Sequence, residues 1–298
     1  MKSVSPFRVL ITGINGFTGV HLERYLLSKG YSVYGTVIDT PSSPNHYQCD
    51  IRDSKEVDRV IEATKPHYII HIAAISFVGE SNASLIYDVN VIGTENILKS
   101  LIKYDIKPKK ILIASSATIY GNQGKEVLDE SMTPTPVNHY GCSKLAMEHI
   151  VSTYFDKLNI IITRPFNYTG VGQAEQFLIP KIIKHYKENS PTIELGNLSV
   201  AREFNSIDFV VECYYKLMSI EDSSIVVNLS SNQPIKLLDV IEQMDNIAGY
   251  KIEVRVNPAF VRPNEIASLA GDTTRLESLI GSIPKLSLVD TLNTMYNG

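Results

Sequence analysis

The chain has 298 residues, of which 44% are hydrophobic and 20% are charged, and its formal net charge is −4. These values are typical of a folded globular enzyme and exclude a disordered chain. The sequence has no basic run that would bind the phosphate backbone of a nucleic acid. No apolar run approaches the roughly 20 residues that span a bilayer, and the first residues lack the apolar segment of a secretory signal. Three widely spaced cysteines indicate reduced thiols, so we expect a cytoplasmic protein with no nucleic-acid or membrane partner.

Short apolar runs alternate with helical patterns over the first 166 residues. Strands are predicted at 7–13, 31–39, 68–74, 109–116 and 159–166, with helices between them at 19–30, 54–65, 84–104 and 139–155. Strands separated by helices of this length form right-handed βαβ units and a parallel sheet. The sequence therefore predicts an α/β fold of Rossmann type, with a doubly wound parallel sheet.

The alternation weakens after residue 166. Strand-like segments at 224–230 and 251–256 lie among shorter helical patterns. We expect residues 1–166 to form one domain and residues 167–298 to form mainly a smaller C-terminal α/β region that binds the substrate, with some segments returning to the sheet.

A glycine-rich loop follows the first predicted strand. The stretch "ITGINGFTG" places Gly13, Gly16 and Gly19 between that strand and the first helix. Glycines there allow a tight turn and a close approach of the backbone to a pyrophosphate, and the helix N-terminus offers N–H groups to the anion. The sequence therefore predicts a dinucleotide-binding loop.

The choice between NAD and NADP stays open. Asp39 lies 20 residues after Gly19, where a carboxylate that binds the adenosine ribose is expected, but it is equally well explained as a loop carboxylate. No Lys or Arg lies between residue 31 and Arg52 that would hold a 2′-phosphate.

A tyrosine and a lysine lie four residues apart in "HYGCSKLAMEHI". This spacing places Tyr140 and Lys144 on one face of a helix. An adjacent ammonium stabilises a phenolate, so the pattern predicts a lowered pKa for Tyr140. Such a proton donor and acceptor suits the interconversion of a carbonyl and an alcohol.

With these features the chain resembles the extended short-chain dehydrogenase/reductase family of nucleotide-sugar enzymes. The resemblance covers nearly the whole chain and rests on the segments "TGINGFTG", "HIAAIS", "NVIGT", "SSATIYG", "YGCSK" and "RPFN". It implies that Ser116 polarises a sugar oxygen, that Tyr140 is the acid/base, and that Lys144 also holds the nicotinamide ribose. It makes 1–166 the NAD(P)-binding domain and 167–298 the nucleotide-sugar-binding region.

The resemblance also implies the residues that contact the cofactor, NADP or NAD. These are Gly13, Asn15, Gly16, Phe17, Asp39, Asp50, Ile51, Ala73, Asn90, Tyr140 and Lys144. Asp50 resembles the family's contact on the adenine side, and Asn90 its structural asparagine near the active site. Tyr120 is expected to pack in the interior, with contact to the substrate as the alternative.

The residues after Ser116 decide against one reaction of this family. Its 4,6-dehydratases have an acidic residue just after the catalytic hydroxyl, whereas Ala117 and Thr118 follow Ser116 here. Reduction of a 4-keto sugar and 4-epimerisation both remain, because "SSATIYG" also resembles the UDP-hexose 4-epimerases.

The C-terminal third resembles the GDP-mannose branch, in particular the GDP-6-deoxy-4-keto-mannose reductases. The resemblance implies that Arg202 holds the nucleoside, that Arg262 neutralises the diphosphate, and that Asn167 binds the diphosphate or the sugar. Arginine presents a planar fork to phosphate oxygens, although either arginine could instead form a salt bridge. Glu203 stands where the family more often has Asp.

The sequence thus predicts an NAD(P)H-dependent reductase of the 4-keto group of a GDP-4-keto-6-deoxy sugar, hexose or heptose, in deoxy-sugar donor biosynthesis. A UDP- or GDP-hexose 4-epimerase with tightly bound NAD is the alternative. A non-catalytic sensing relative is a third interpretation, against which the complete set of Ser116, Tyr140 and Lys144 argues. We further expect a homodimer built on helices 84–104 and 139–155, and no metal site, because no His, Cys, Asp and Glu residues show ligand spacing. His67 and His71 are interpreted as core or turn histidines.

Overall fold

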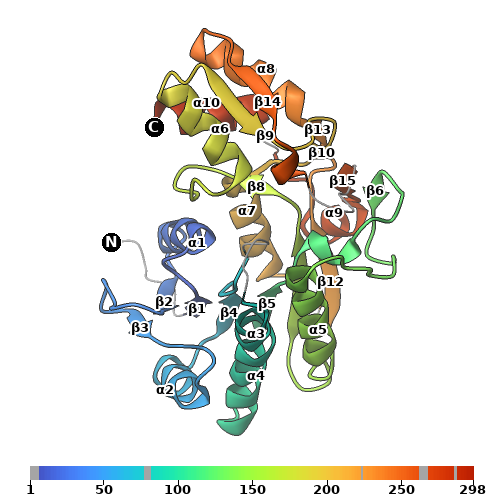
Figure 1. The fold of residues 1–298 in the computed structure, drawn as a ribbon. Helices are drawn as coiled ribbons and strands as arrows, with labels where there is room; N and C mark the ends of the chain where they lie inside the picture. The colour runs from blue at the N-terminus through green and yellow to red at the C-terminus, as the bar shows by residue number, and fades with distance from the viewer. Residues whose placement is uncertain (1–6, 77–81, 223, 262–267, 285–286) are drawn as a thin grey trace.

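The computed structural model describes residues 7–76, 82–222, 224–261, 268–284 and 287–298 (Figure 1). Its main feature is a seven-stranded sheet in the order β12-β7-β5-β4-β1-β2-β3, in which every neighbouring pair is parallel. The strands are β1 (Arg8–Thr12), β2 (Ser32–Val37), β3 (His46–Gln48), β4 (Tyr68–His71), β5 (Lys110–Ala114), β7 (Ile160–Pro165) and β12 (Ile225–Leu229). The predicted Rossmann-type fold is confirmed.

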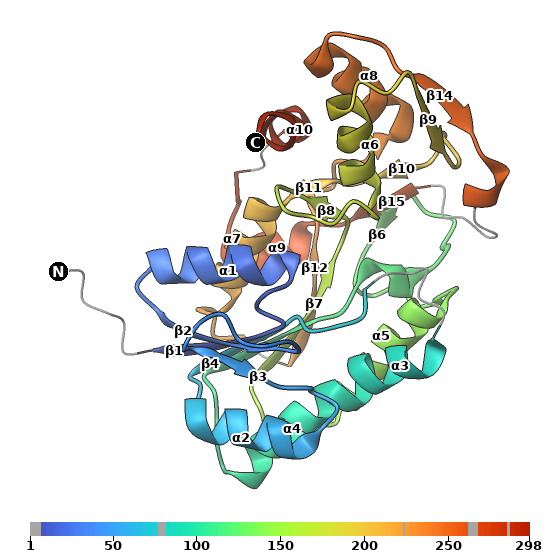
Figure 2. The ribbon, with the colours of Figure 1, turned by 60° about the vertical axis from the view of Figure 1, so that its left-hand side comes forward.

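Helices cover both faces of this sheet (Figure 2). On one face lie α1 (Phe17–Ser28), α7 (Ile207–Leu217) and α9 (Thr274–Ile280). On the other lie α2 (Ser54–Thr64), α3 (Ala83–Tyr87), α4 (Thr94–Lys103) and α5 (His139–Ser152). Each face has its own buried core, so the strands are apolar on both sides.

The predicted helix 84–104 is divided by a π-helical turn. This turn, η1 (Asp88–Gly93), joins α3 to α4. The Asn90 side chain accepts a hydrogen bond from the Ile75 N–H at 2.9 Å and donates to Ile75 O at 3.2 Å. The wider turn therefore presents Asn90 to the loop that follows β4, and π-helical turns of this kind are frequent at functional sites.

A second core lies above the carboxyl edge of the sheet (Figures 1 and 2). It is formed by α6 (Leu178–Lys187), α8 (Leu237–Ala248), α10 (Leu288–Asn297) and the parallel pair β9 (Thr192–Leu195) and β14 (Glu253–Val256). Short strands join the two parts: β13 (Ile235–Lys236), β10 (Ala201–Arg202), β15 (Ser268–Gly271) and β6 (Val127–Leu128) in one sheet, and β8 (Tyr168–Thr169) with β11 (Asn205–Ser206) in another. Two 3₁₀ turns complete the elements, η2 (Ala117–Tyr120) and η3 (Pro258–Phe260).

The chain crosses between the two parts more than once. After β7 it enters the smaller part, and α7, β12 and α9 then return to the large sheet. None of the described helices has both the length and the hydropathy needed to span a membrane.

A fully buried carboxylate ties the crossing segments together. The Oε1 atom of Glu203 accepts hydrogen bonds from Ser230 Oγ at 2.6 Å and from the Gly271 N–H at 2.7 Å. Its Oε2 atom accepts from Asn205 Nδ2 and from the Ser231 N–H, both at 2.9 Å. Hydrogen bonds to a charged group are stronger than neutral ones, so Glu203 joins the segment after β10 to the ends of β12 and β15.

His71 is a core histidine, as its sequence context predicted. Its two ring nitrogens lie 2.7 Å from Thr12 Oγ1 and 2.8 Å from Thr94 Oγ1, and it thereby links β4 to β1 and to α4. Complete burial, with a smaller effect from the Lys144 charge, lowers the pKa of His71 to about 3.

This buried imidazole makes folding pH-dependent. Between pH 6.5 and about 3 the unfolded chain binds a proton at His71 that the folded chain does not, so the free energy of unfolding falls as the pH falls. The slope approaches about 1.4 kcal/mol per pH unit below pH 6. We expect urea unfolding of His71→Gln to show a flatter dependence over this range. The exposed His149→Gln variant is the control, and an unchanged slope in His71→Gln would contradict the assignment.

Candidate active site

The predicted site residues converge on one edge of the large sheet. Gly13 follows β1, Asp39 follows β2, Ala73 follows β4, Ser116 follows β5 and Asn167 follows β7. The strand order reverses between β1 and β4, whose following helices cover opposite faces. Ligands of open α/β sheets bind at the carboxyl ends of strands at such a point.

The glycine loop is shaped for an anion. Gly13 has φ +70°, and a Cβ atom there would lie 3.0 Å from the Ala73 Cα. A Cβ atom on Gly19 would lie 2.5 Å from Ile14 O, so only glycine lets α1 start this close to β1. Gly16 precedes α1 without a side-chain cap, and Asn15 and Gly16 are exposed. The first N–H groups of α1 therefore have no side-chain cap, and such groups are suited to binding a phosphate.

An aromatic contact ties this loop to the substrate side. Phe17, the first residue of α1, stacks on Tyr168 with ring centres 6.0 Å apart and an interplanar angle of 15°. The Tyr168 hydroxyl lies 2.8 Å from Thr18 Oγ1. Tyr168 was not singled out from the sequence, although its position two residues after the "RPF" segment was a usable signal.

The acidic residues on the adenine side differ in their partners. Asp39 is exposed two residues after the end of β2. Asp50 is bound by Arg52, whose Nη2 donates to Oδ2 at 2.6 Å and whose Nε lies 3.0 Å from both oxygens, and this contact lowers the pKa of the carboxyl group. The neighbouring Ile51 is buried against Gly93, where a Cβ atom would lie 2.7 Å from the isoleucine side chain.

The end of β5 and the start of α5 bring together Ser116, Tyr140 and Lys144. Asn138 caps α5 by accepting a hydrogen bond from the Gly141 N–H at 2.8 Å, which places Tyr140 in the first turn. Lys144 donates from Nζ to Ala114 O on β5 at 2.8 Å. Ser116, Tyr140 and Lys144 are only 8%, 9% and 4% exposed.

Thr118 orients the Ser116 hydroxyl, a role that the sequence did not reveal. The Ser116 Oγ atom accepts hydrogen bonds from the Thr118 N–H at 3.2 Å and from Thr118 Oγ1 at 2.9 Å. Because both are donated to the oxygen, the serine proton is directed elsewhere, and the Ser116 side chain is hydrogen-bonded with Tyr140.

Burial, rather than the lysine, dominates the protonation of Tyr140. It raises the pKa of the phenol to about 12, against the lowering effect of the hydrogen bond with Ser116. The predicted net lowering of this pKa is therefore wrong for this structure, because burial dominates and the Lys144 ammonium donates its hydrogen bond to Ala114 O. Burial also lowers the pKa of Lys144 to about 8, although the nearby Glu148 charge opposes this shift.

Asn90 holds the start of α5. Its Nδ2 atom donates to Ser143 Oγ at 3.0 Å, and Ser143 Oγ donates to Tyr140 O at 2.8 Å. Together with its two hydrogen bonds to Ile75, this makes Asn90 a link between the loop after β4 and the turn that carries Tyr140.

The predicted substrate residues lie on the side of the smaller part. Asn167 is exposed, and its carbonyl oxygen accepts from the Asn205 N–H at 2.9 Å. Arg202 on β10 is half-buried and donates from Nη1 to Ala201 O at 2.8 Å. Arg262 lies outside the described residues. Within the described part of the chain, no group of three or more His, Cys, Asp and Glu side chains could hold a metal ion.

Comparison with known proteins places this geometry in a family. The family model described as GDP-mannose 4,6 dehydratase matches residues 10–295. The chain is 35% identical over 291 residues to a GDP-6-deoxy-D-talose 4-dehydrogenase of Aggregatibacter actinomycetemcomitans, with 97% of each chain covered. Among solved structures it is similar to a proposed epimerase from Burkholderia cenocepacia J2315, with 38% identity, a TM-score of 0.93, and 99% and 98% of the two chains covered.

A second solved structure is RMD from Pseudomonas aeruginosa in complex with NADPH, with 26% identity, a TM-score of 0.86, and 99% and 98% of the two chains covered. The family model spans nearly the whole chain, and the resemblance inferred from the sequence is confirmed. The chain belongs to the GDP-mannose 4,6-dehydratase family of extended short-chain dehydrogenase/reductase enzymes.

Proposed function

We propose that this protein is an NAD(P)H-dependent reductase of the 4-keto group of a GDP-4-keto-6-deoxy sugar. The observation that carries the proposal is the buried group of Ser116, Tyr140 and Lys144 at the carboxyl edge of the sheet, next to β5, with Ala117 and Thr118 in place of a carboxylate after Ser116. These residues support hydride and proton exchange at a carbonyl but supply no base there to remove a carbon-bound proton.

Each side chain has one task in the proposed reaction. A bound nicotinamide supplies the hydride that reaches C4. Tyr140 gives its proton to the sugar oxygen, and its raised pKa keeps the phenol protonated up to about pH 12. Ser116 donates a hydrogen bond to the same oxygen, and Lys144 contributes a positive charge that stabilises the phenolate left on Tyr140. Proton uptake from solvent restores Tyr140.

Two carboxylates in this part of the fold, Glu148 and Glu130, do not replace the missing base. Glu148 lies one turn after Lys144 on α5, but both of its oxygens are bound by Arg164. Glu130 accepts a hydrogen bond from the Asn228 N–H at 2.8 Å. Both carboxylates are engaged within the protein, so we infer that the chain does not dehydrate its substrate although its family is described by that activity.

The names of two relatives support a GDP-linked substrate and chemistry at C4. One relative is the GDP-6-deoxy-D-talose 4-dehydrogenase, and the other is a GDP-6-deoxy-D-mannose reductase of Pseudomonas aeruginosa PAO1, 27% identical over 303 residues. Talose and mannose differ only in configuration at C4, so a single 4-keto sugar relates both products. We propose that Asn167, Arg202 and Arg262 bind the nucleoside diphosphate, since arginine is suited to phosphate oxygens.

A 4-epimerase that retains NAD is the second candidate. It is favoured by the similarity to the proposed epimerase from Burkholderia cenocepacia, at 38% identity. The same three side chains serve oxidation and re-reduction at C4, and the two candidates differ in whether the reaction consumes a reduced nicotinamide.

We also propose a cytoplasmic homodimer formed through α3, α4 and α5. Ile92 on η1 and Ile102 on α4, both within the predicted helix 84–104, are 46% and 43% exposed, and such side chains are suited to a subunit interface. Sedimentation that shows only monomer would exclude the dimer.

The substrate and the cofactor can be decided in one assay. We expect GDP-4-keto-6-deoxymannose to oxidise NADH or NADPH in proportion to the sugar consumed, as followed by nicotinamide absorbance. With both cofactors run in parallel, the preferred one decides whether Asp39 faces a free ribose or tolerates a 2′-phosphate. A flat trace with both would contradict the reductase, and interconversion of a nucleotide hexose without net absorbance change would support the epimerase.

Removal of the proton donor should separate chemistry from binding. In Tyr140→Phe we expect kcat to fall by about 10²- to 10⁴-fold, because general acid catalysis is lost, with nicotinamide binding kept within a few-fold. Fluorescence titration of the reduced cofactor measures the binding. Tyr154→Phe, at a tyrosine two residues after the end of α5, is the control. Full activity in Tyr140→Phe would remove this residue from the mechanism.

The dependence of kcat/KM on pH should report the ionisation of Lys144. Its pKa of about 8 means that the ammonium is present below pH 8 and is lost above it, whereas Tyr140 stays protonated up to about pH 12. We therefore expect kcat/KM for reduction to fall above about pH 8, since kcat/KM reports the groups of the free enzyme. In Lys144→Met the activity should be lower and this decline absent. The same decline in both proteins would assign it to another group.

A further inference from the structure

A buried ion pair joins helix α5 to strand β7. Arg164 on β7 donates from Nε to Oε1 of Glu148 at 3.0 Å and from Nη2 to Oε2 at 2.7 Å, and the two side chains are only 6% and 7% exposed. Burying two charges is costly, and apolar residues of similar volume often replace such pairs without loss of stability. The importance of this pair therefore lies in what else it contacts.

The same guanidinium holds Tyr120. Nη1 of Arg164 donates to the Tyr120 hydroxyl at 2.9 Å, and the guanidinium carbon lies 5.0 Å from the centre of the ring. Tyr120 is fully buried and is the last residue of η2, the single turn that begins after Ser116. Burial raises the pKa of Tyr120 to about 12, so the phenol keeps its proton and donates it to Oδ1 of Asn228 at 2.7 Å.

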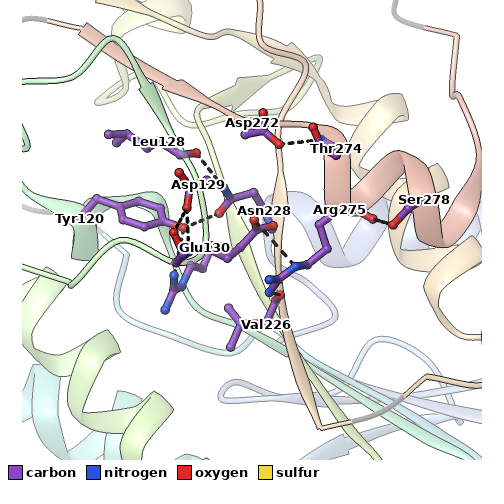
Figure 3. Close-up of polar contacts among 12 residues, drawn as sticks. Tyr120, Leu128, Asp129, Glu130, Val226, Asn228, Asp272, Thr274, Arg275 and Ser278 are labelled. Atoms are coloured by element: carbon purple, nitrogen blue, oxygen red, sulfur yellow. Dashed lines mark hydrogen bonds and ion pairs between the residues drawn. The ribbon is translucent and has the colours of Figure 1, made fainter.

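Asn228 on β12 fixes the other side of the Tyr120 hydroxyl (Figure 3). Its Nδ2 donates to Leu128 O at 3.0 Å, and its backbone N–H donates to Oε1 of Glu130 at 2.8 Å. The Nε atom of Arg275 lies 4.0 Å from the other oxygen of Glu130. Because both partners of the Tyr120 hydroxyl are themselves held, η2 cannot shift without breaking a buried hydrogen bond.

The guanidinium of Arg164 also holds helix α5, through its hydrogen bonds to Glu148. Glu148 lies one turn after Lys144 and two turns after Tyr140, and all three side chains are buried. Lys144 contacts Ala114 O at the end of β5. One arginine on β7 therefore contacts both the helix that carries Tyr140 and the turn that carries Ser116.

We propose that Arg164 is a positioning residue, which fixes the turn of Ser116 relative to the helix that carries Tyr140. It touches neither of these two hydroxyls and acts on Ser116 through Tyr120. This inference rests on the roles proposed above for Ser116 and Tyr140. Reacting groups must be held to within about 0.5 Å of their productive positions, and a 1 Å displacement can cost about 100-fold in rate.

The variant Tyr120→Phe tests the link, because it removes one hydroxyl and leaves the ring in place. We expect kcat to fall by about 10- to 100-fold, with KM and the dissociation constant of the reduced nicotinamide changed by less than about 3-fold. The matched control is Tyr186→Phe on α6, which also loses a buried hydroxyl, here bonded to Asp245 Oδ1 at 2.7 Å. It should lower Tm by a similar amount without lowering kcat.

A double variant separates positioning from a merely structural effect. If Tyr120 acts through Ser116, adding Tyr120→Phe to Ser116→Ala should lower kcat by less than about 2-fold further, because coupled residues are not additive. A full additional loss in the double variant would overturn the proposal. So would a kcat in Tyr120→Phe that equals the kcat of Tyr186→Phe at equal Tm.

Turnover of GDP-4-keto-6-deoxymannose by the unmodified enzyme is the separate control for the proposed function. If this turnover is absent, the proposed reductase function is contradicted. Crystal structures of the Tyr120→Phe and Tyr186→Phe variants then test the positioning role of Arg164. In Tyr120→Phe, but not in Tyr186→Phe, Ser116 Oγ should then be displaced relative to Tyr140 by more than about 0.5 Å. An unmoved Ser116 would overturn the proposal.

Discussion

The contact between helix α5 and the end of β5 is the constraint on which the rest of the site depends. The Lys144 ammonium donates to Ala114 O at 2.8 Å. This bond brings Tyr140, which lies one turn before Lys144 on α5, beside Ser116, which lies two residues after Ala114. A lysine that is only 4% exposed keeps its proton only if polar groups replace water around it. The carbonyl oxygen at the strand end does this, and the position of α5 is thereby coupled to the charge of its lysine.

Burial also shifts the pKa values of Tyr140 and Lys144. It moves the pKa of Tyr140 upward and that of Lys144 downward, because an apolar environment disfavours the charged form of each. A phenol that keeps its proton at neutral pH is suited to protonating a sugar oxygen during reduction. In the proposed reduction Tyr140 is thus a proton donor before any ligand is bound, and Lys144 contributes charge to the step that follows proton transfer.

The two parts of the fold are joined by polar contacts at the same edge of the sheet. Glu203 connects the segment after β10 to the ends of β12 and β15, while Phe17 and Tyr168 stack between the phosphate loop and the segment after β7. The residues that we propose to bind the substrate, such as Arg202, therefore have a defined position relative to the strand ends. A buried carboxylate with several donors gives this junction a single geometry, because each donor would be left unsatisfied in any other arrangement.

The sequence by itself determined the parallel sheet, the glycine loop and the spacing of Tyr140 and Lys144, because periodicity and local spacing are properties of neighbouring residues. The resemblance to the family, carried by one short segment, also pointed to Ser116 and to the absence of a carboxylate after it. Only the tertiary structure revealed the π-helical turn at Asn90, the hydrogen bonds from Thr118 to Ser116, and which later segment, β12, returns to the sheet, since each depends on residues brought together by folding. For the same reason the direction of the Tyr140 pKa shift was wrongly predicted: spacing shows that a lysine is near, whereas the packed structure decides that its ammonium turns to a backbone carbonyl and that burial prevails.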